Sequence, residues 1–206
     1  MAAAINMPEE GDPEAGVIVA HGQANDLDHE LLVTFSEGLA ERGYASLRFN
    51  FPYKEAGHNA PDDRETLIKA YRAARDELAR RLGDAKIFLA GKSMGARIAA
   101  LVAAQDGAAG LIFLGFPIHR PGQEPRNYDH ILKMEPPMLF FAGTRDPFCE
   151  IEKLQKVLEQ RTGKSTIQIV EDCEHSFIPS EGDDRPVELI YRTIAMVTAD
   201  WLDEIT

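Results

Sequence analysis

A serine flanked by two glycines lies between a predicted strand and a predicted helix. The pentad GKSMG at 91–95 directly follows the apolar stretch 86–90 and directly precedes the small residues of 96–104. Glycines at these two positions permit a turn so tight that a side chain would collide with the neighbouring backbone. Such a nucleophile elbow presents the serine hydroxyl at the carboxyl edge of a sheet, where it can attack a substrate. A serine that only shapes the turn is the alternative.

A serine hydroxyl becomes an effective nucleophile when a base takes its proton and a third group orients that base. Asp146 follows the predicted strand 138–142, and His175 follows the predicted strand 166–170. Reactive groups gather in loops at the carboxyl ends of parallel strands, so we expect both to lie near Ser93. The chain order Ser93, Asp146, His175 is that of α/β-hydrolases and predicts a Ser/His/Asp triad.

Two of these assignments have alternatives. Asp172 lies three residues before His175 and is a second candidate for the acid. The turn that follows a predicted strand favours Asp146. A solvent-exposed loop position is the alternative for His175.

Acyl transfer also requires hydrogen-bond donors for the oxyanion that develops in the transition state. The amide of Met94 lies at the N-terminus of the predicted helix, directly after Ser93. The second donor is predicted in the turn after the strand 16–20, from the amide of Gln23 or Ala24. These two loops together predict an oxyanion hole.

The residues expected to contact the substrate follow predicted strands or flank the nucleophile: His21, Gly22, Ala24, Tyr53, Lys92 and His119. His21 is expected mainly to brace the oxyanion loop through hydrogen bonds. Lys92 can attract an acidic substrate, although a solvated side chain that points away from the pocket is favoured. Packing is the alternative for Tyr53, and a surface position is the alternative for His119.

Strands and helices that could position these residues alternate along the chain. Apolar runs of strand length occur at 16–20, 44–49, 86–90, 110–114, 138–142 and 166–170. Most show little polar alternation, which is typical of parallel strands covered on both faces. Residues at helical spacing between them predict a single doubly wound α/β domain over 1–206, with about six mostly parallel strands flanked by helices.

The clearest helix is predicted over 67–82, with Asp62 and Glu65 as its capping box and Gly83 as its end. Further apolar stripes predict helices at 31–39, 151–158 and 187–201. A long irregular stretch at 116–135 contains three prolines and is predicted to act as a minimal lid, because loops of this length are usually functional.

The composition of the chain indicates which partners, cellular compartment and cofactors to expect. A net charge of −12 repels phosphate backbones and anionic lipid surfaces, so we expect neither nucleic acid nor membrane partners. The first seven residues lack the features of a secretory signal, and the two cysteines make no disulfide framework, which favours free thiols and a reducing cytoplasm. A disulfide between Cys149 and Cys173 is the alternative. No metal-site spacing or phosphate loop is present, so we expect no metal or cofactor. A homodimer is compatible with the sequence.

Several stretches are similar to those of compact α/β-hydrolases related to dienelactone hydrolase: HGQANDLDHE, GLAERGYASLRFNFPY, LAGKSMGARIAA, LGFPIHRPG, GTRDPFC and CEHSF. The resemblance implies Ser93 as nucleophile, Asp146 as acid, His175 as base and 21–24 as oxyanion loop. Dienelactone hydrolases carry cysteine where Ser93 stands, so their lactone substrate is not implied. About 15 residues precede Gly16, too few for the first strands of larger α/β-hydrolases.

The expected function is therefore a serine hydrolase that acts through an acyl-enzyme on a small ester, thioester or related acyl substrate. The alternative is a catalytically silent α/β-hydrolase fold that serves as a binding or scaffolding module. All three triad groups are present, which favours the enzyme.

Overall fold

A twisted, mostly parallel sheet forms the centre of the molecule. The computed structural model describes residues 1–125 and 128–206, and in this part of the chain seven strands pair in the order β1-β3-β2-β4-β5-β6-β7. The strands are β1 (Ala3–Asn6), β2 (Ala15–Ala20), β3 (Ala45–Phe49), β4 (Lys86–Lys92), β5 (Leu111–Leu114), β6 (Met138–Gly143) and β7 (Ser165–Val170). From β3 to β7 all neighbours are parallel, as predicted.

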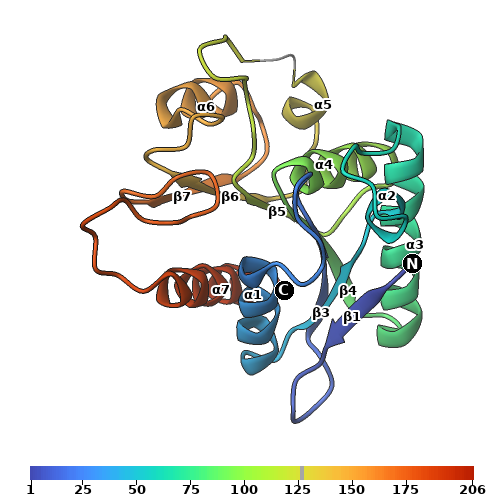
Figure 1. Ribbon diagram of the computed structural model, residues 1–206. Helices are drawn as coiled ribbons and strands as arrows, with labels where there is room; N and C mark the ends of the chain where they lie inside the picture. The colour runs from blue at the N-terminus through green and yellow to red at the C-terminus, as the bar shows by residue number, and fades with distance from the viewer. Residues whose placement is uncertain (126–127) are drawn as a thin grey trace.

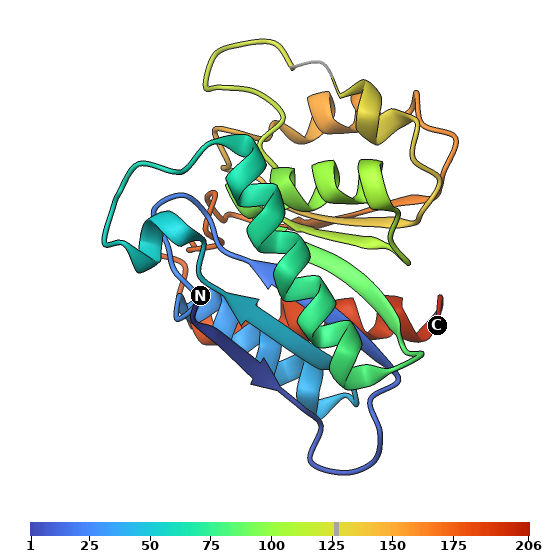
Figure 2. The same ribbon diagram turned by 90° about the vertical axis from the view of Figure 1, so that its right-hand side faces the viewer.

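The first strand corrects the expectation that no strand precedes Gly16. β1 pairs antiparallel with β3, and Ala3 faces Phe49 in the register. It lies at the outer edge of the sheet beside β3 (Figure 2). Its four residues are mostly half-buried, so they lack the continuous apolar run that identifies the other strands in the sequence.

Helices cover both faces of the sheet. They are α1 (Glu30–Glu41), α2 (Pro52–Glu55), α3 (Arg64–Leu82), α4 (Met94–Asp106), α5 (Asp129–Leu132), α6 (Ile151–Leu158) and α7 (Val187–Asp203). α1 and α7 lie side by side on one face, and α3, α4 and α6 cover the other (Figure 1). Every residue of β2 is buried, and its side chains alternate between two cores, with Ile18 in one and Val17 and Val19 in the other.

The start of α3 differs by one residue from the prediction. Asp63 is the N-cap, and its side chain accepts a hydrogen bond of 2.9 Å from the amide of Thr66. The predicted cap, Asp62, instead accepts a hydrogen bond of 2.7 Å from the amide of Tyr53. Gly83 ends the helix as predicted, with a φ of 64° that disfavours side chains.

The segment 116–135 packs onto the core more than it covers an opening. The described part contains α5 and buries large side chains, among them Phe116, Ile118 and Tyr128. Residues 126–127 of the predicted lid lie outside the described residues.

Cys149 and Cys173 are both buried free thiols. No helix in the described part of the chain is long and apolar enough to cross a membrane.

Candidate active site

Ser93 occupies a strained turn between β4 and α4. Its φ is 53° and its ψ is −109°, a conformation that costs roughly 1–3 kcal/mol for a residue with a side chain. The surrounding backbone leaves no room for side chains at the two glycines of the turn. A Cβ atom on Gly95 would lie 2.4 Å from the carbonyl oxygen of Ala20, and one on Gly91 would lie 2.4 Å from the carbonyl carbon of Gly95. The two glycines therefore let the turn hold Ser93 at the carboxyl edge of the sheet, as predicted.

Asp146, His175 and Ser93 form a continuous hydrogen-bonded chain. The Nε2 atom of His175 lies 2.8 Å from the Oγ atom of Ser93. Its Nδ1 atom lies 2.7 Å from the Oδ2 atom of Asp146, whose side chain is buried. The other carboxylate oxygen of Asp146 accepts a hydrogen bond of 2.8 Å from the amide of Phe148. An Nδ1–H donated to Asp146 leaves the Nε2 lone pair free to accept the serine proton.

The structure also separates the two candidate acids. Asp172 is exposed, and its carboxylate interacts with Ser180 and Arg145. Asp146 is therefore the carboxylate that contacts His175, as predicted, and Asp172 contacts other residues.

Two glycines that the sequence interpretation did not identify allow His175 to reach Ser93. In the sheet, β5 and β6 separate β4 from β7, so the loop after β7 must cross the ends of both strands. At the end of β6, a Cβ atom on Gly143 would lie 2.3 Å from the carbonyl oxygen of Cys173. After β5, a Cβ atom on Gly115 would lie 3.0 Å from the carbonyl oxygen of His175. Both glycines leave space for the histidine loop.

His21 braces the loop after β2, as expected. Its Nδ1–H donates to the carbonyl oxygen of Gly22 at 2.7 Å, and its Nε2 atom accepts a hydrogen bond of 3.0 Å from the amide of Phe51. Burial lowers the pKa of His21, and the contact with the Gly22 carbonyl opposes this shift. The side chain is therefore a neutral imidazole that ties the loop to the segment after β3. It does not line the cavity beside Ser93.

Tyr53 has a different role from the predicted contact with substrate. It is buried and does not line the cavity beside Ser93. Its hydroxyl donates to the carbonyl oxygen of Gln23 at 2.8 Å, and burial raises its pKa to about 12, so it remains protonated at neutral pH. This contact fixes the peptide between Gln23 and Ala24. In the described part of the chain, the amides of Gln23 and Ala24 have no acceptor.

The Met94 amide is the first of α4, so it has no acceptor within that helix. The positive end of the helix dipole lies at the same position. The donors predicted for an oxyanion hole are thus present on both loops next to Ser93.

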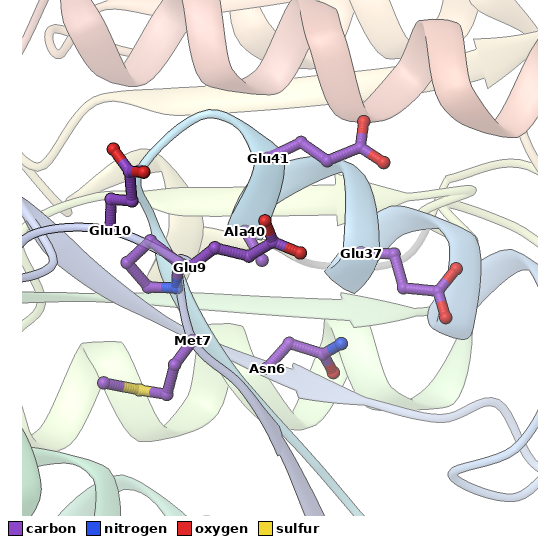
Figure 3. Close-up of a pocket in the computed structure, with 9 residues that line it drawn as sticks. Asn6, Met7, Glu9, Glu10, Glu37, Ala40 and Glu41 are labelled. Atoms are coloured by element: carbon purple, nitrogen blue, oxygen red, sulfur yellow. The ribbon is translucent and has the colours of Figure 1, made fainter.

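A cavity of about 520 Å³ opens beside the triad. Its lining combines backbone of the oxyanion loop with mainly polar side chains: Gly22, Gln23, Ala24, Asn25, Asn59, Lys92, Ser93, Phe148, His175 and Ser176. No described residue of 116–135 lines it. A second cavity, of about 580 Å³, lies between α1 and the loop after β1. Its carboxylates spread apart (Figure 3) and it contains neither a serine nor a histidine.

Lys92 and His119 are placed differently from the expectation. Lys92 is only 3% exposed, because strand alternation directs it to the same buried face of β4 as Ala90. The favoured solvated position was therefore wrong. His119 is also buried, and it does not line the cavity beside Ser93. Its ring contacts the carbonyl oxygen of Arg120 and accepts a hydrogen bond from the amide of Glu150. His119 therefore connects 116–120 to the loop after β6, which also carries Asp146.

Among the described residues, no three His, Cys, Asp or Glu side chains are grouped so that they could hold a metal ion. The hydrogen-bonded chain of Ser93, His175 and Asp146 has the geometry that can generate a nucleophilic oxygen from a serine hydroxyl.

Comparisons with known proteins agree with this architecture. The family described as "Alpha/beta hydrolase domain" matches residues 13–203. Among solved structures, an alpha-beta serine hydrolase homologue from Coxiella burnetii is 20% identical, with a TM-score of 0.78, and the match covers 95% of this chain and 90% of that one. A serine hydrolase without a lid from Xanthomonas campestris is 19% identical, with a TM-score of 0.77, covering 97% and 88%. Dienelactone hydrolase from Anabaena variabilis is 20% identical, with a TM-score of 0.73, covering 98% and 91%.

Proposed function

The chain belongs to the alpha/beta hydrolase family, and we propose that it is a serine hydrolase. Its substrate is a small ester, thioester or related acyl compound, which it cleaves through an acyl-enzyme. The hydrogen-bonded chain from Asp146 through His175 to Ser93 carries this proposal, because it lies at the wall of an open cavity. The solved relatives described as serine hydrolases lend it support.

In the first half of the reaction, the Oγ atom of Ser93 attacks the acyl carbon while the Nε2 atom of His175 takes the hydroxyl proton. Asp146 stabilises the resulting imidazolium and holds the ring in place. The imidazolium then gives its proton to the leaving group, and the acyl group remains on Ser93. In the second half, water replaces the leaving group and the same proton transfers release the acid.

The oxyanion of each tetrahedral intermediate is stabilised by the amides of Met94 and Gln23. Removing one such donor costs about 3 kcal/mol of transition-state stabilisation in measured cases. His21 and Tyr53 act as positioning residues, because each bonds to a carbonyl oxygen of the loop that supplies the second donor. Their contacts preorganise the donor before substrate arrives.

The proposal is tested with p-nitrophenyl esters of increasing acyl length, from acetate to octanoate, on the purified chain. We expect turnover that is highest for short acyl groups, because Phe148 is the one large apolar side chain among the described residues that line the cavity, so a long acyl chain finds little apolar wall. Ser93→Ala should remove turnover and keep the thermal melt. If the folded wild type hydrolyses none of these esters faster than the Ser93→Ala variant, a binding module without catalysis is the better account.

A further inference from the structure

The cavity beside the triad has an unusual charge for this chain. The protein carries 34 acidic residues and a net charge of −12. Yet the described lining of this cavity contains no aspartate or glutamate, and Lys92 is its one lysine or arginine. The other side chains there include the amides of Gln23, Asn25 and Asn59, which can donate hydrogen bonds. This local composition is that of a site for an anion.

The side chain of Lys92 is largely buried, while its Nζ atom still reaches solvent and has no partner in the described part of the chain. In the described part of the chain, its ammonium group forms no hydrogen bond and no ion pair, although the residue is only 3% exposed. Burial lowers its pKa, and the carboxylates of Glu174 and Asp146 oppose this shift by attraction through space. Buried charges in proteins are normally paired and hydrogen-bonded, because leaving water is costly for an ion.

Both neighbouring carboxylates accept hydrogen bonds from other groups. Asp146 accepts hydrogen bonds from His175 and Phe148 with its two oxygens. Glu174 accepts a hydrogen bond of 2.7 Å from the amide of Ser176. Neither carboxylate forms an ion pair with Lys92 in the described part of the chain. The ammonium group therefore has no hydrogen-bonded partner within the described part of the chain, and its three donors can serve an anion that comes from outside.

Packing alone does not account for a lysine at this position. Ala90, two residues earlier on the same face of β4, fills its place in the core as a small apolar side chain. An apolar residue at position 92 would bury surface without the cost of an ammonium ion. Lys92 also lines the cavity beside Ser93, and its ammonium group is close enough to Asp146 for attraction through space. A charge at this position can attract an anionic substrate.

We propose that the substrate of this hydrolase carries a carboxylate, and that Lys92 binds it while Ser93 attacks an acyl carbon a few bonds away. This inference deepens the proposed function and rests on it. The half-esters of short dicarboxylic acids are simple compounds that carry both groups. The carboxylate can belong to the acyl part or to the leaving group, and the two cases differ in their test substrates.

The test compares kcat/KM for matched charged and neutral esters. For the acyl part, the pair is p-nitrophenyl hemisuccinate and methyl p-nitrophenyl succinate. For the leaving group, the pair is the acetate esters of 4-hydroxybenzoic acid and 4-hydroxybenzamide. We expect the wild type to prefer the charged member of one pair by at least about 10-fold, as a desolvated charge-assisted contact allows. Equal rates within both pairs would overturn the proposal.

Two variants identify the group responsible. Lys92→Met, or Lys92→Gln if the first does not fold, should reduce the charged-to-neutral ratio by at least about 10-fold. Lys86→Met removes a lysine from the opposite end of the same strand, where it is exposed, and should leave the ratio unchanged. A preference that survives in both Lys92 variants would contradict the assignment.

A binding measurement separates this inference from the proposed function. Calorimetry on the Ser93→Ala variant, with monomethyl succinate and dimethyl succinate as probes, does not depend on turnover. We expect tighter binding of the monoanion, and loss of the difference when Lys92→Met is added. If no ester is hydrolysed by the wild type but this difference is measured, the proposed function fails and the anion site remains. If esters are hydrolysed and no difference is measured, the anion site fails alone.

Discussion

The Nε2 atom of His175 lies 2.8 Å from the Oγ atom of Ser93, although 82 residues separate them in the sequence. The two residues follow strands that are not neighbours, because β5 and β6 lie between β4 and β7. The histidine loop therefore crosses the carboxyl ends of two strands. Gly115 and Gly143 occupy the crossing points, where a side chain would meet the backbone of that loop.

Gly143→Ala should displace the loop that carries His175. The new Cβ atom would lie 2.3 Å from the carbonyl oxygen of Cys173, so backbone must move. A shift of about 1 Å at a reacting group can cost 10²-fold in rate, and we expect kcat for a p-nitrophenyl ester to fall by about that factor. Gly16→Ala is the matched control, because its Cβ would crowd only side-chain atoms, at the amino end of β2 and away from Ser93. Similar kcat values for the two variants would contradict the role of Gly143.

Asp146→Asn should lower kcat by about 10³–10⁴-fold with a small change in thermal melt. The amide cannot accept the Nδ1–H of His175 and stabilise the imidazolium as a carboxylate does, although it can keep the contact with the amide of Phe148. Asp172→Asn is the control, since Asp172 is exposed and lies in the same loop as the histidine. If Asp172→Asn is the slower variant, the acid has been assigned to the wrong residue.

Tyr53→Phe should affect the transition state more than substrate binding. It removes the donor to the carbonyl oxygen of Gln23 and loosens the loop that supplies an oxyanion donor. Outright loss of a donor costs 10²–10³-fold, so we expect a smaller loss of about 10-fold in kcat, with KM nearly unchanged. Tyr44→Phe is matched in burial and loses a hydrogen bond to Asp203 at the amino end of β3. A kcat equal to that of Tyr44→Phe would exclude this role for Tyr53.

His21 should make stability depend on pH below neutrality. Burial lowers its pKa from the ordinary value of 6.5, so the unfolded chain binds a proton that the folded chain does not. The contribution of His21 to the free energy of unfolding is therefore fully present above pH 6.5. It decreases as the pH drops from there toward the lowered pKa. One such group contributes a slope of up to about 1.4 kcal/mol per pH unit.

Urea unfolding at pH 7.5 and 5.5 measures this slope. His21→Gln should reduce it, and His58→Gln, at an exposed position, should leave it as in the wild type. The pKa values of His29 and His130 are also lowered, mainly by burial, so part of the slope should persist in the His21 variant. An unchanged slope in His21→Gln would show that this residue is not held neutral.

Much of the fold could be predicted because each strand leaves a local signal. Parallel strands buried on both faces are continuous apolar runs, and all six predicted strands are present, within a few residues of their predicted ends. β1 was missed because an edge strand of four half-buried residues carries no such run. The N-cap of α3 was misplaced by one residue, since Asp62 and Asp63 are both good caps and only tertiary contacts distinguish them.

The proximity of the site residues could be predicted because strand ends fix where loops meet. Ser93, Asp146 and His175 each follow a parallel strand, and these loops share one edge of the sheet. The roles of Tyr53 and Lys92 depend instead on where a side chain points after a turn. Neither composition nor spacing records that direction. Tyr53, predicted to line the pocket, bonds instead to the carbonyl oxygen of Gln23, and Lys92, predicted to be solvated, is buried.

Labelling with a fluorophosphonate, followed by intact-mass measurement and peptide mapping, tests most directly whether Ser93 is an activated nucleophile. The wild type should gain one adduct on Ser93, and Ser93→Ala should gain none. Ser176→Ala, which removes the other serine of the cavity lining, should still be labelled. A folded wild type that stays unlabelled, or a Ser93→Ala variant that is labelled as fast as the wild type, would contradict the proposed hydrolase.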